Sequence, residues 1–276
     1  MSDSLLGQKA NYPDRYDPKL LVGLNRTDSR QKLRLDTSHL EIFGIDSWTC
    51  YELSWLNEKG VPRNSILYFS YSCHSKFFIE SKSLKLYLFS LNNKRFSSNE
   101  ELVETIKEDL ETTLKTEISI EISAEPREII SNENSIDTLD IKEPSFQPNS
   151  LVLLSTDKDV DEDITCSLFR SLCPVTAQPD WATVHIAYKG KQITHESLLS
   201  YLLSYRNHQG FHEECVEKIF QDIKERCEIE SLLVRANYLR RGGIEINPVR
   251  TTHENYEQIS REDRKSTRLN SSHLLI

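Results

Sequence analysis

The sequence lacks a long apolar run and a leader. No window of its 276 residues approaches the roughly eighteen apolar residues that a membrane-spanning helix needs. The first twenty residues place no apolar stretch behind a basic start, as a secretion signal would. We therefore expect a cytoplasmic protein with no membrane partner.

Positive charge is also in short supply. The chain has 34 Lys and Arg residues against 43 Asp and Glu residues, which gives a formal net charge of -9. A general nucleic-acid binder neutralises phosphates with clustered Lys and Arg, and the overall field here would repel them. We expect no nucleic-acid partner, and an anionic cofactor would have to meet a local basic patch.

Cysteines are few and irregularly spaced, and no C-x-x-C pair indicates structural zinc or a disulfide framework. The six are Cys50, Cys73, Cys166, Cys173, Cys215 and Cys227. We expect free thiols in a reducing compartment.

His208 and His212 have the i, i+4 spacing of zinc-binding helices, but no third ligand follows at a characteristic spacing, so we expect no metal. A G-x-G-x-x-G turn is missing too, so the sequence does not support a Rossmann cofactor site.

The end of the chain looks foreign to the protein. Residues 263–273 read DRKSTRLNSSH, which resembles the translation of a widely used sequencing adapter. An ordinary polar tail is the alternative. We leave residues 263–276 out of the fold prediction.

An internal repeat organises the rest. Residues 79–93 align with residues 193–207, and residues 100–110 align with residues 213–223, where six of the eleven residues are identical. Two copies of one supersecondary unit explain this pattern. The copies differ in their polar residues, because Glu80, Lys82 and Lys85 of the first copy become Thr194, Glu196 and Leu199 in the second. Because the two copies carry different polar residues, we expect them to form one composite site together.

Each copy should end in an amphipathic helix. Apolar residues recur at helical spacing in residues 102–114 and 216–223, and Ser98 with Glu101 forms a capping box before the first. Strand-like runs occupy residues 65–72, 151–155, 182–188 and 232–239. This mixture predicts an α+β fold with antiparallel sheet. The acidic, proline-containing residues 131–150 read as a surface linker, so we place the module boundary near residue 150.

Several segments together resemble the two-module nitrile reductases of queuosine biosynthesis. They are IESKSLKLY (residues 79–87), SLCPVTAQPDWATV (171–184), GFHEECVE (210–217) and YLRRGGIEINP (238–248). Two further segments, LLGQKANYPDRYDPKLL near the start and YELSWLNEKG (51–60), are also similar to that family. The motifs are specific as a set, in the family's order over about residues 5 to 250, whereas any one alone would be weak.

The resemblance implies tandem tunnelling-fold modules, with antiparallel sheets and helices packed on one face. The N-terminal module would be residues 1–150 and the C-terminal module residues 151–262. It further implies an NADPH-dependent oxidoreductase that reduces the nitrile of 7-cyano-7-deazaguanine to an aminomethyl group, in queuosine tRNA-modification biosynthesis. We also expect a homodimer.

A nitrile carbon accepts hydride poorly, and adding a thiolate first gives a thioimide that is reduced like an imine. By resemblance Cys173 is the nucleophile, and the other cysteines read as buried residues. Asp180 is the corresponding proton donor. Without the motif it would read as a solvated turn residue. A nearby aromatic such as Trp181 could exclude water from it and keep it protonated.

The remaining site residues also follow from the resemblance. Glu213 should accept hydrogen bonds from the guanidine-like edge of the substrate, with His212 against the ring and Ile79, Glu80 and Ser81 bordering it. Read alone, Glu213 would be a first-turn acid, since Glu100 holds the matching place. The positions for NADPH are Ser81, Lys82, Arg241 and Gly242, whose charges suit phosphates and whose glycine admits them closely.

Two other functions stay open at this point. A thiol-dependent amide or amidine hydrolase would use Cys173 as nucleophile and His212 as base, and would need no hydride. A non-catalytic purine-binding or assembly module would keep Glu213 without a reactive thiol. Consumption of NADPH separates the first from a reductase, and alkylation of Cys173 that substrate slows would count against the second.

Overall fold

The structure, a computed structural model, describes residues 12–32, 34–35, 42–127 and 134–254. The suspected adapter-derived tail, residues 263–276, lies outside the described residues.

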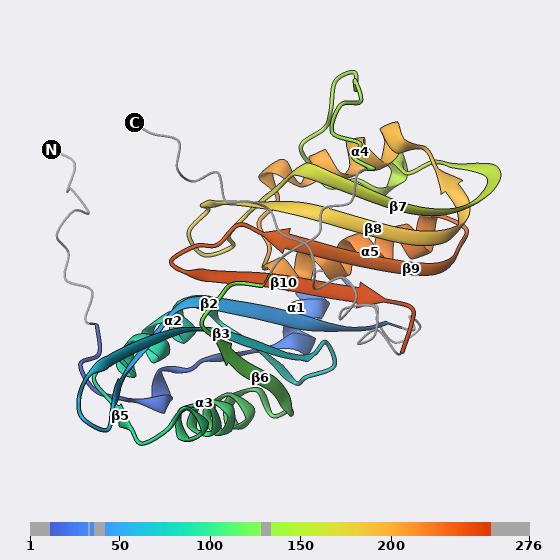
Figure 1. The fold of residues 1–276 in the computed structure, drawn as a ribbon. Coiled ribbons are helices and arrows are strands. Elements are labelled where there is room, and N and C mark those ends of the chain that lie inside the picture. The colour runs from blue at the N-terminus through green and yellow to red at the C-terminus, as the bar shows by residue number, and fades with distance from the viewer. Residues whose placement is uncertain (1–11, 33, 36–41, 128–133, 255–276) are drawn as a thin grey trace, which may run out of the picture.

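One antiparallel sheet runs through both halves of the chain (Figure 1). Its strand order is β6-β3-β2-β10-β9-β8-β7. The strands are β2 (Phe43–Asn57), β3 (Pro62–Ser72), β6 (Ile118–Ser123), β7 (Ser155–Leu172), β8 (Pro179–Ile193), β9 (Ile229–Tyr238) and β10 (Ile244–Thr251). The short β5 (Arg95–Phe96) runs parallel to the end of β2, and β1 (Gly23–Asn25) pairs with β4 (Phe77–Ile79) in a separate ribbon.

The five α-helices of the described chain are α1 (Arg26–Lys32), α2 (Ser81–Ser90), α3 (Asn99–Leu114), α4 (His195–Leu203) and α5 (His212–Arg226). Three short 3-10 helices span Pro18–Leu20, Ser150–Val152 and Ser204–Asn207. The two predicted amphipathic helices correspond to α3 and α5, whose apolar stripes are buried. The predicted α+β class with antiparallel sheet is confirmed.

The repeat is visible in matching hydrogen bonds. The Tyr87 hydroxyl on α2 donates to Asp109 on α3, and the Tyr201 hydroxyl on α4 donates to Asp222 on α5, both over 2.6 Å. At the start of each helix pair, the hydroxyl of Tyr71 or Tyr188 accepts the N–H of Ile79 or Ile193, respectively. Each copy is therefore a strand hairpin followed by two helices that a buried Tyr–Asp bond joins.

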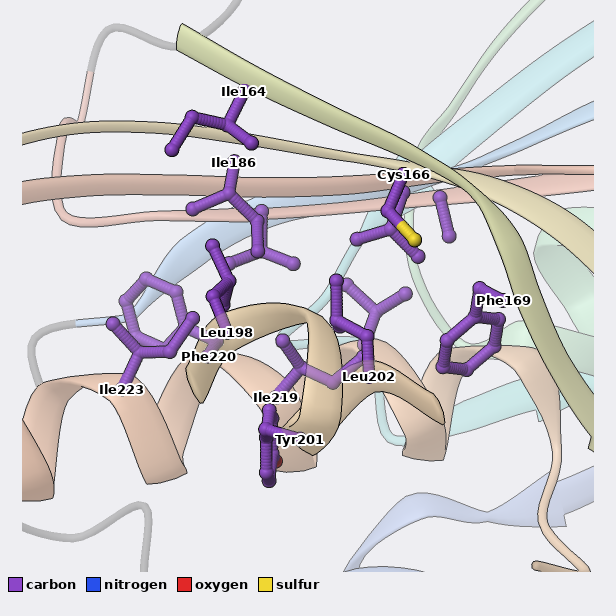
Figure 2. Packing of buried hydrophobic residues seen from close by; sticks show 14 of the residues in the cluster. Ile164, Cys166, Phe169, Ile186, Leu198, Tyr201, Leu202, Ile219, Phe220 and Ile223 are labelled. Atoms are coloured by element: carbon purple, nitrogen blue, oxygen red, sulfur yellow. The ribbon is translucent and has the colours of Figure 1, made fainter. Parts of the chain in front are cut away.

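The two copies bury separate apolar clusters on the same face of the sheet. Figure 2 shows the C-terminal cluster, in which Ile164 and Ile186 of the strands meet Leu198 and Ile219 of the helices. Ile244 of β10 belongs to the N-terminal cluster and pairs with Cys50 of β2. Arg250, on the same side of β10, pairs with Val234 of the C-terminal cluster. The polar residues between the clusters consequently lie at the seam of the two copies.

Two local predictions were wrong. The strand predicted at residues 151–155 begins only at Ser155, the first residue of β7: Asn149 accepts the N–H of Leu151 and begins a 3-10 turn, and the N–H of Leu154 donates to Ser197 Oγ. The capping box is only half formed, because Ser98 Oγ accepts the N–H of Glu101 while the Glu101 carboxylate accepts from the N–H and hydroxyl of Ser97.

The described part of the predicted linker, residues 134–150, is mostly exposed but anchored to the second copy. Ile136 is 4% exposed and belongs to the C-terminal cluster. The Asp137 carboxylate accepts the N–H and hydroxyl of Ser167 on β7. The boundary near residue 150 stays a prediction.

Over the described residues, every helix is too short or too polar to span a bilayer.

Candidate functional site

A cavity of about 270 Å³ lies at the seam between the two copies. All ten residues that the sequence analysis assigned to the site line it: Ile79, Glu80, Ser81, Lys82, Cys173, Asp180, His212, Glu213, Arg241 and Gly242. The first four come from β4 and α2 of the N-terminal copy, and the others come from the C-terminal copy. The structure thus brings together residues up to 163 positions apart in the chain.

Cys173 occupies the turn that follows β7. Its N–H donates to the Gln178 carbonyl over 2.9 Å, and its own carbonyl accepts the N–H of Ala177 over 2.9 Å. This closed turn leaves the thiol partly exposed, whereas the five other cysteines are buried. Partial burial opposes ionisation, but donors outweigh it: the side chain and N–H of Thr176, the N–H of Val175 and the Arg241 side chain hold the pKa of the Cys173 thiol below its usual range. A thiol so placed is suited to nucleophilic attack.

Asp180 is the second residue of β8 and is 4% exposed. Its carboxylate lies 3.4 Å from His212 Nε2 and 3.3 Å from Arg241 Nε. The expectation that Trp181 shields this acid is wrong, because successive side chains of a strand point to opposite faces. Trp181 is 38% exposed and lies against Arg170. His212 and Arg241 contact Asp180 instead.

His212 begins α5 and lies flat on Tyr238 of β9. The two ring centroids are 3.7 Å apart and the rings are 3° from parallel. Burial lowers the pKa of His212, although the hydrogen bond and charge of Asp180 act in the opposite direction. The imidazole is thus held neutral with one nitrogen toward Asp180.

Glu213, the next residue of α5, is 3% exposed, and its Oε1 has no hydrogen-bond partner among the described residues. Burial and the negative charge of Asp46 raise the pKa of Glu213 to about 8, while Arg26 and Arg250 oppose the shift. An unpartnered buried carboxyl group is unfavourable in the free protein. Its position in the cavity wall makes it a ready acceptor for a ligand's N–H groups.

The first copy contributes the start of α2. The Glu80 carboxylate accepts the N–H groups of Lys82 and Ser83 at 2.9 and 2.7 Å, so it caps the helix while it lines the cavity. Ile79 is 2% exposed and its N–H is held by the Tyr71 hydroxyl. These contacts fix the part of the cavity wall that the first copy contributes.

A basic rim surrounds the cavity. Lys85 of α2 reaches across the seam, where its Nζ donates to the Gly242 carbonyl over 2.8 Å. Gly242 has φ +57°, and a Cβ there would lie 2.5 Å from Lys85 Nζ. Lys82 is exposed beside it, and Arg241 donates to Gln178 Oε1 over 3.1 Å. Two lysines, an arginine and a glycine in the left-handed backbone conformation fit the phosphates of a nucleotide cofactor.

Some residues of the site escaped the sequence analysis. Thr176 and Gln178 lie within the SLCPVTAQPDW segment and Tyr238 starts the YLRRGG segment, so their position beside the assigned residues was the available signal. No sequence signal pointed to Asp46 or Arg250, because a single charged residue in a strand is usually exposed to solvent.

His208 and His212 do not share a helical turn, because His208 ends the 3-10 helix before α5. Among the residues that the structure describes, no three His, Cys, Asp or Glu side chains are grouped so that they could hold a metal ion.

Comparison with known proteins identifies the family. Residues 12–122 match a family described as nitrile reductase, 7-cyano-7-deazaguanine-reductase N-term, and residues 179–257 match one described as QueF-like protein. The NADPH-dependent 7-cyano-7-deazaguanine reductase of Legionella pneumophila strain Lens is 44% identical, over 91% of this chain and 90% of its own. The enzyme of the same name from Xanthomonas campestris strain B100 is also 44% identical, over 91% and 93%.

A solved structure, the archaeosine synthase QueF-Like in the apo form, is 19% identical over 35% of this chain and 94% of its own, with a TM-score of 0.30. The family matches cover most of both copies, and the curated relatives run nearly the full length. This chain belongs to the NADPH-dependent 7-cyano-7-deazaguanine reductase family.

Proposed function

We propose that this chain reduces the nitrile group of 7-cyano-7-deazaguanine to the aminomethyl group of 7-aminomethyl-7-deazaguanine, with NADPH as the reductant, in queuosine tRNA-modification biosynthesis. The observation that carries the proposal is one cavity that holds an activated thiol, a buried acid and an unpartnered carboxyl group. The family and the names of the curated relatives support the same reaction.

Cys173 is the proposed nucleophile. Its sulfur adds to the nitrile carbon, so that a C–S bond forms while the nitrile's triple bond becomes the C=N bond of a thioimide, and the nitrogen takes up a proton. The lowered pKa of the thiol raises the thiolate fraction near neutral pH.

Asp180 is the proposed source of that proton. It is buried beside a neutral His212 and the Arg241 guanidinium. His212 lies against the ring of the substrate and fixes the carboxyl group of Asp180 by its contact of 3.4 Å. Positioned proton donors of this kind contribute about 10² to 10⁴ in rate.

Glu213 is proposed to recognise the deazaguanine. A ring N–H and an exocyclic amine side by side match the two oxygens of a carboxylate. Because Glu213 Oε1 has no internal partner among the described residues, no protein hydrogen bond has to be broken at that oxygen when the substrate enters. Ile79, Glu80 and Ser81 border the substrate from the other copy.

Ser81, Lys82, Arg241 and Gly242 are the residues proposed to hold NADPH, and Lys85 joins them through its bond to the Gly242 carbonyl. When bound, NADPH supplies hydride, and because reduction of a nitrile to a primary amine takes four electrons, two molecules are oxidised for each product.

The hydrolase alternative is less well supported, because it needs His212 as a base for Cys173. His212 instead contacts Asp180, and the groups that lower the pKa of Cys173 are hydrogen-bond donors.

We further propose a cytoplasmic homodimer. The edge strands β6 and β7 offer backbone groups to a second copy, and sedimentation would measure the mass of the assembly.

The deciding experiment is intact-mass measurement after mixing the protein with 7-cyano-7-deazaguanine in the absence of NADPH. We expect an adduct equal to the mass of the nitrile, absent in Cys173→Ala and present in a matched Cys227→Ala variant. Subsequent addition of NADPH should oxidise two molecules per aminomethyl product. No adduct, or a Cys173→Ala variant that still reduces the nitrile, would refute the covalent mechanism.

A further inference from the structure

A buried ion cluster lies near Glu213, which interacts with the charges of three of its members. We define it as Arg26, Arg30, Asp46, Glu217 and Arg250. Asp46 contacts both Arg26 Nη2 at 2.6 Å and Arg250 Nη2 at 2.8 Å, and Glu217 Oε1 contacts Arg250 Nη2 at 2.8 Å. Four of these side chains are at most 4% exposed and that of Arg30 is 16% exposed.

The cluster joins the two copies of the repeat. Arg26 and Arg30 come from α1 and Asp46 from β2, whereas Glu217 comes from α5 and Arg250 from β10. Glu217 is one helical turn after Glu213, so both carboxyl groups lie on the same side of α5. The cluster therefore meets the cavity wall at the residue proposed to bind the substrate.

The arginines are fully engaged with other carboxylates. Arg250 Nε and Nη2 both donate to Glu217, and Arg30 donates to both oxygens of the same group. Arg26 donates to Asp46 and to the Ser75 carbonyl. Glu213, in contrast, keeps Oε1 without a partner among the described residues.

We propose that Asp46 is a positioning residue for the deazaguanine site: by holding Arg26 and Arg250 it keeps them from neutralising Glu213, and so leaves that carboxyl group free for the substrate. The proposal rests on the proposed function, since it needs Glu213 as the substrate's acceptor. The negative charge of Asp46 is the main electrostatic cause of the raised pKa of Glu213, and the two arginines act against it.

The groups that face Glu213 come from several elements. Arg26 on α1, Asp46 on β2, Tyr71 on β3 and Arg250 on β10 interact with Glu213 electrostatically. His212 and Glu217 flank it on α5 itself. Removal of the Asp46 charge leaves the positive groups of this set less compensated, which favours the carboxylate form of Glu213.

The test measures affinity for 7-cyano-7-deazaguanine by calorimetry as a function of pH, in a Cys173→Ala background that prevents the covalent step. Because the carboxylate form accepts the substrate's N–H groups, affinity should rise with pH through a midpoint near pH 8, the pKa of Glu213, and level off above it. Glu213→Gln should remove this rise.

In the same background, Asp46→Asn should move the midpoint to lower pH by about one pH unit, a tenfold shift in the ionisation equilibrium. Because the released Arg26 and Arg250 then compete with the substrate for the Glu213 carboxylate, the affinity reached at high pH should fall as well. Arg30→Gln removes a positive charge at the more exposed edge of the cluster, so it should move the midpoint to higher pH. Asp28→Asn, the same change as at Asp46 but on the exposed side of α1, should leave the midpoint in place.

Opposite shifts from the two cluster variants would support the proposal, because a general loosening of the fold would not reverse its sign. An unmoved midpoint, or an unchanged affinity at high pH, in folded Asp46→Asn would overturn it. If Asp46→Asn does not fold, Arg30→Gln decides alone, and a midpoint that stays or falls would count against the proposal. Failure of the Cys173→Ala background to bind substrate at any pH would instead overturn the proposed function itself, and the inference with it.

Discussion

At the scale of single residues, the two acids of the cavity have different surroundings. Asp180 is contacted by His212 and Arg241, whereas Glu213 has burial and a like charge around it and an oxygen without a partner. An acid with a charged partner is held in one orientation, and an acid without one is available to a ligand. This difference supports separate roles for the two acids, with Glu213 the one that keeps an oxygen for a ligand.

Asp180→Asn tests the first role. We expect substrate binding to persist and turnover to fall by at least about 10²-fold, because an amide is not a useful proton donor near neutral pH. Single-turnover kinetics and calorimetric titration measure the two separately, with exposed Asp157→Asn as the matched control. Near-normal turnover in the Asp180 variant would remove it from the mechanism.

Glu213→Gln tests the second role through stability. Because the pKa of Glu213 is raised from 4.5 to about 8 in the folded protein, the folded state holds this proton more tightly than the unfolded chain does. The free energy of unfolding therefore falls as pH rises through that window. The variant lacks this loss, so its Tm relative to the unsubstituted protein should increase between pH 5 and pH 8, by at least about 3 °C.

Thermal unfolding at the two pH values checks this prediction. Glu217 provides the opposite case: the Arg250, Arg30 and Arg26 charges overcome its burial and lower its pKa to about 2. Its contribution is present above pH 4.5 and is lost as pH falls toward 2. A Glu213→Gln variant whose Tm difference does not change with pH would contradict the assigned environment.

The sequence predicted the residues that line the cavity better than the residues that surround them. Cys173, Asp180, His212 and Glu213 were found through motifs, which carry residue types at fixed spacing. The partners that set their properties, such as Tyr238 stacked on His212 and Asp46 near Glu213, belong to distant strands. Their proximity depends on the pairing of β10 with β2 and β9, which no local pattern shows.

At the scale of elements, the buried Tyr–Asp bonds hold each helix pair together. Tyr201 is fully buried, and its hydroxyl contacts both Asp222 and Tyr205. We expect Tyr201→Phe to reduce the free energy of unfolding by about 1 to 3 kcal/mol, because Asp222 loses a donor inside the core. Denaturant titration measures this change, and the KM values for substrate and NADPH should stay as they were.

The equivalent Tyr87→Phe variant is the natural comparison. One donor remains after either substitution, since Asp109 also accepts from the Tyr16 hydroxyl and Asp222 also accepts from Lys218 Nζ, each at 2.6 Å. The Tyr87–Asp109 bond is only partly buried, however, whereas the Tyr201 hydroxyl is buried and also contacts Tyr205. The loss of stability should therefore be smaller than for Tyr201→Phe. Equal losses of stability in the two variants would show that the two Tyr–Asp bonds contribute equally despite their different burial.

Helices were easier to predict than strands. The stripes of α3 and α5 repeat at helical spacing and were located from the sequence. The strands β7 and β2 were not, because β7 begins with a run of exposed charged residues and β2 is buried at nearly every position over its first half, so neither alternates cleanly. The apolar residues 151–154 resemble a strand in sequence, but the N–H groups of Leu151 and Leu154 donate to side chains and those of Val152 and Leu153 to carbonyls of a 3-10 turn.

At the scale of the whole molecule, one supersecondary unit occurs twice, and its two copies carry different polar residues. The sheet is continuous across the seam because β10 of the second copy pairs with β2 of the first over eight residues. The ion cluster and the Lys85–Gly242 bond cross the same seam. Separation of the copies would therefore divide the cavity wall and expose the buried charges of the cluster.

The composite site can be tested without cutting the chain. Lys82→Glu combined with Lys85→Leu gives the first copy the residues that the second carries at Glu196 and Leu199. The helix should tolerate them, since α4 already has them at equivalent positions. The substitution removes two positive charges and the bond to the Gly242 carbonyl, so the KM for NADPH should rise by at least about tenfold. The nitrile adduct at Cys173 should still form.

A matched control carries the same change of charge far from the cavity, with Lys107→Glu on α3 and Lys142→Leu in the exposed segment before β7. This control should keep the KM for NADPH, because interactions between exposed charges separated by more than about 10 Å are largely screened at moderate salt. Steady-state kinetics with varied NADPH distinguishes the two double variants. If the first reduces the nitrile with an unchanged KM, the N-terminal copy does not contribute to cofactor binding. If it loses the adduct as well, Lys82 and Lys85 act on the substrate or on the fold rather than on NADPH.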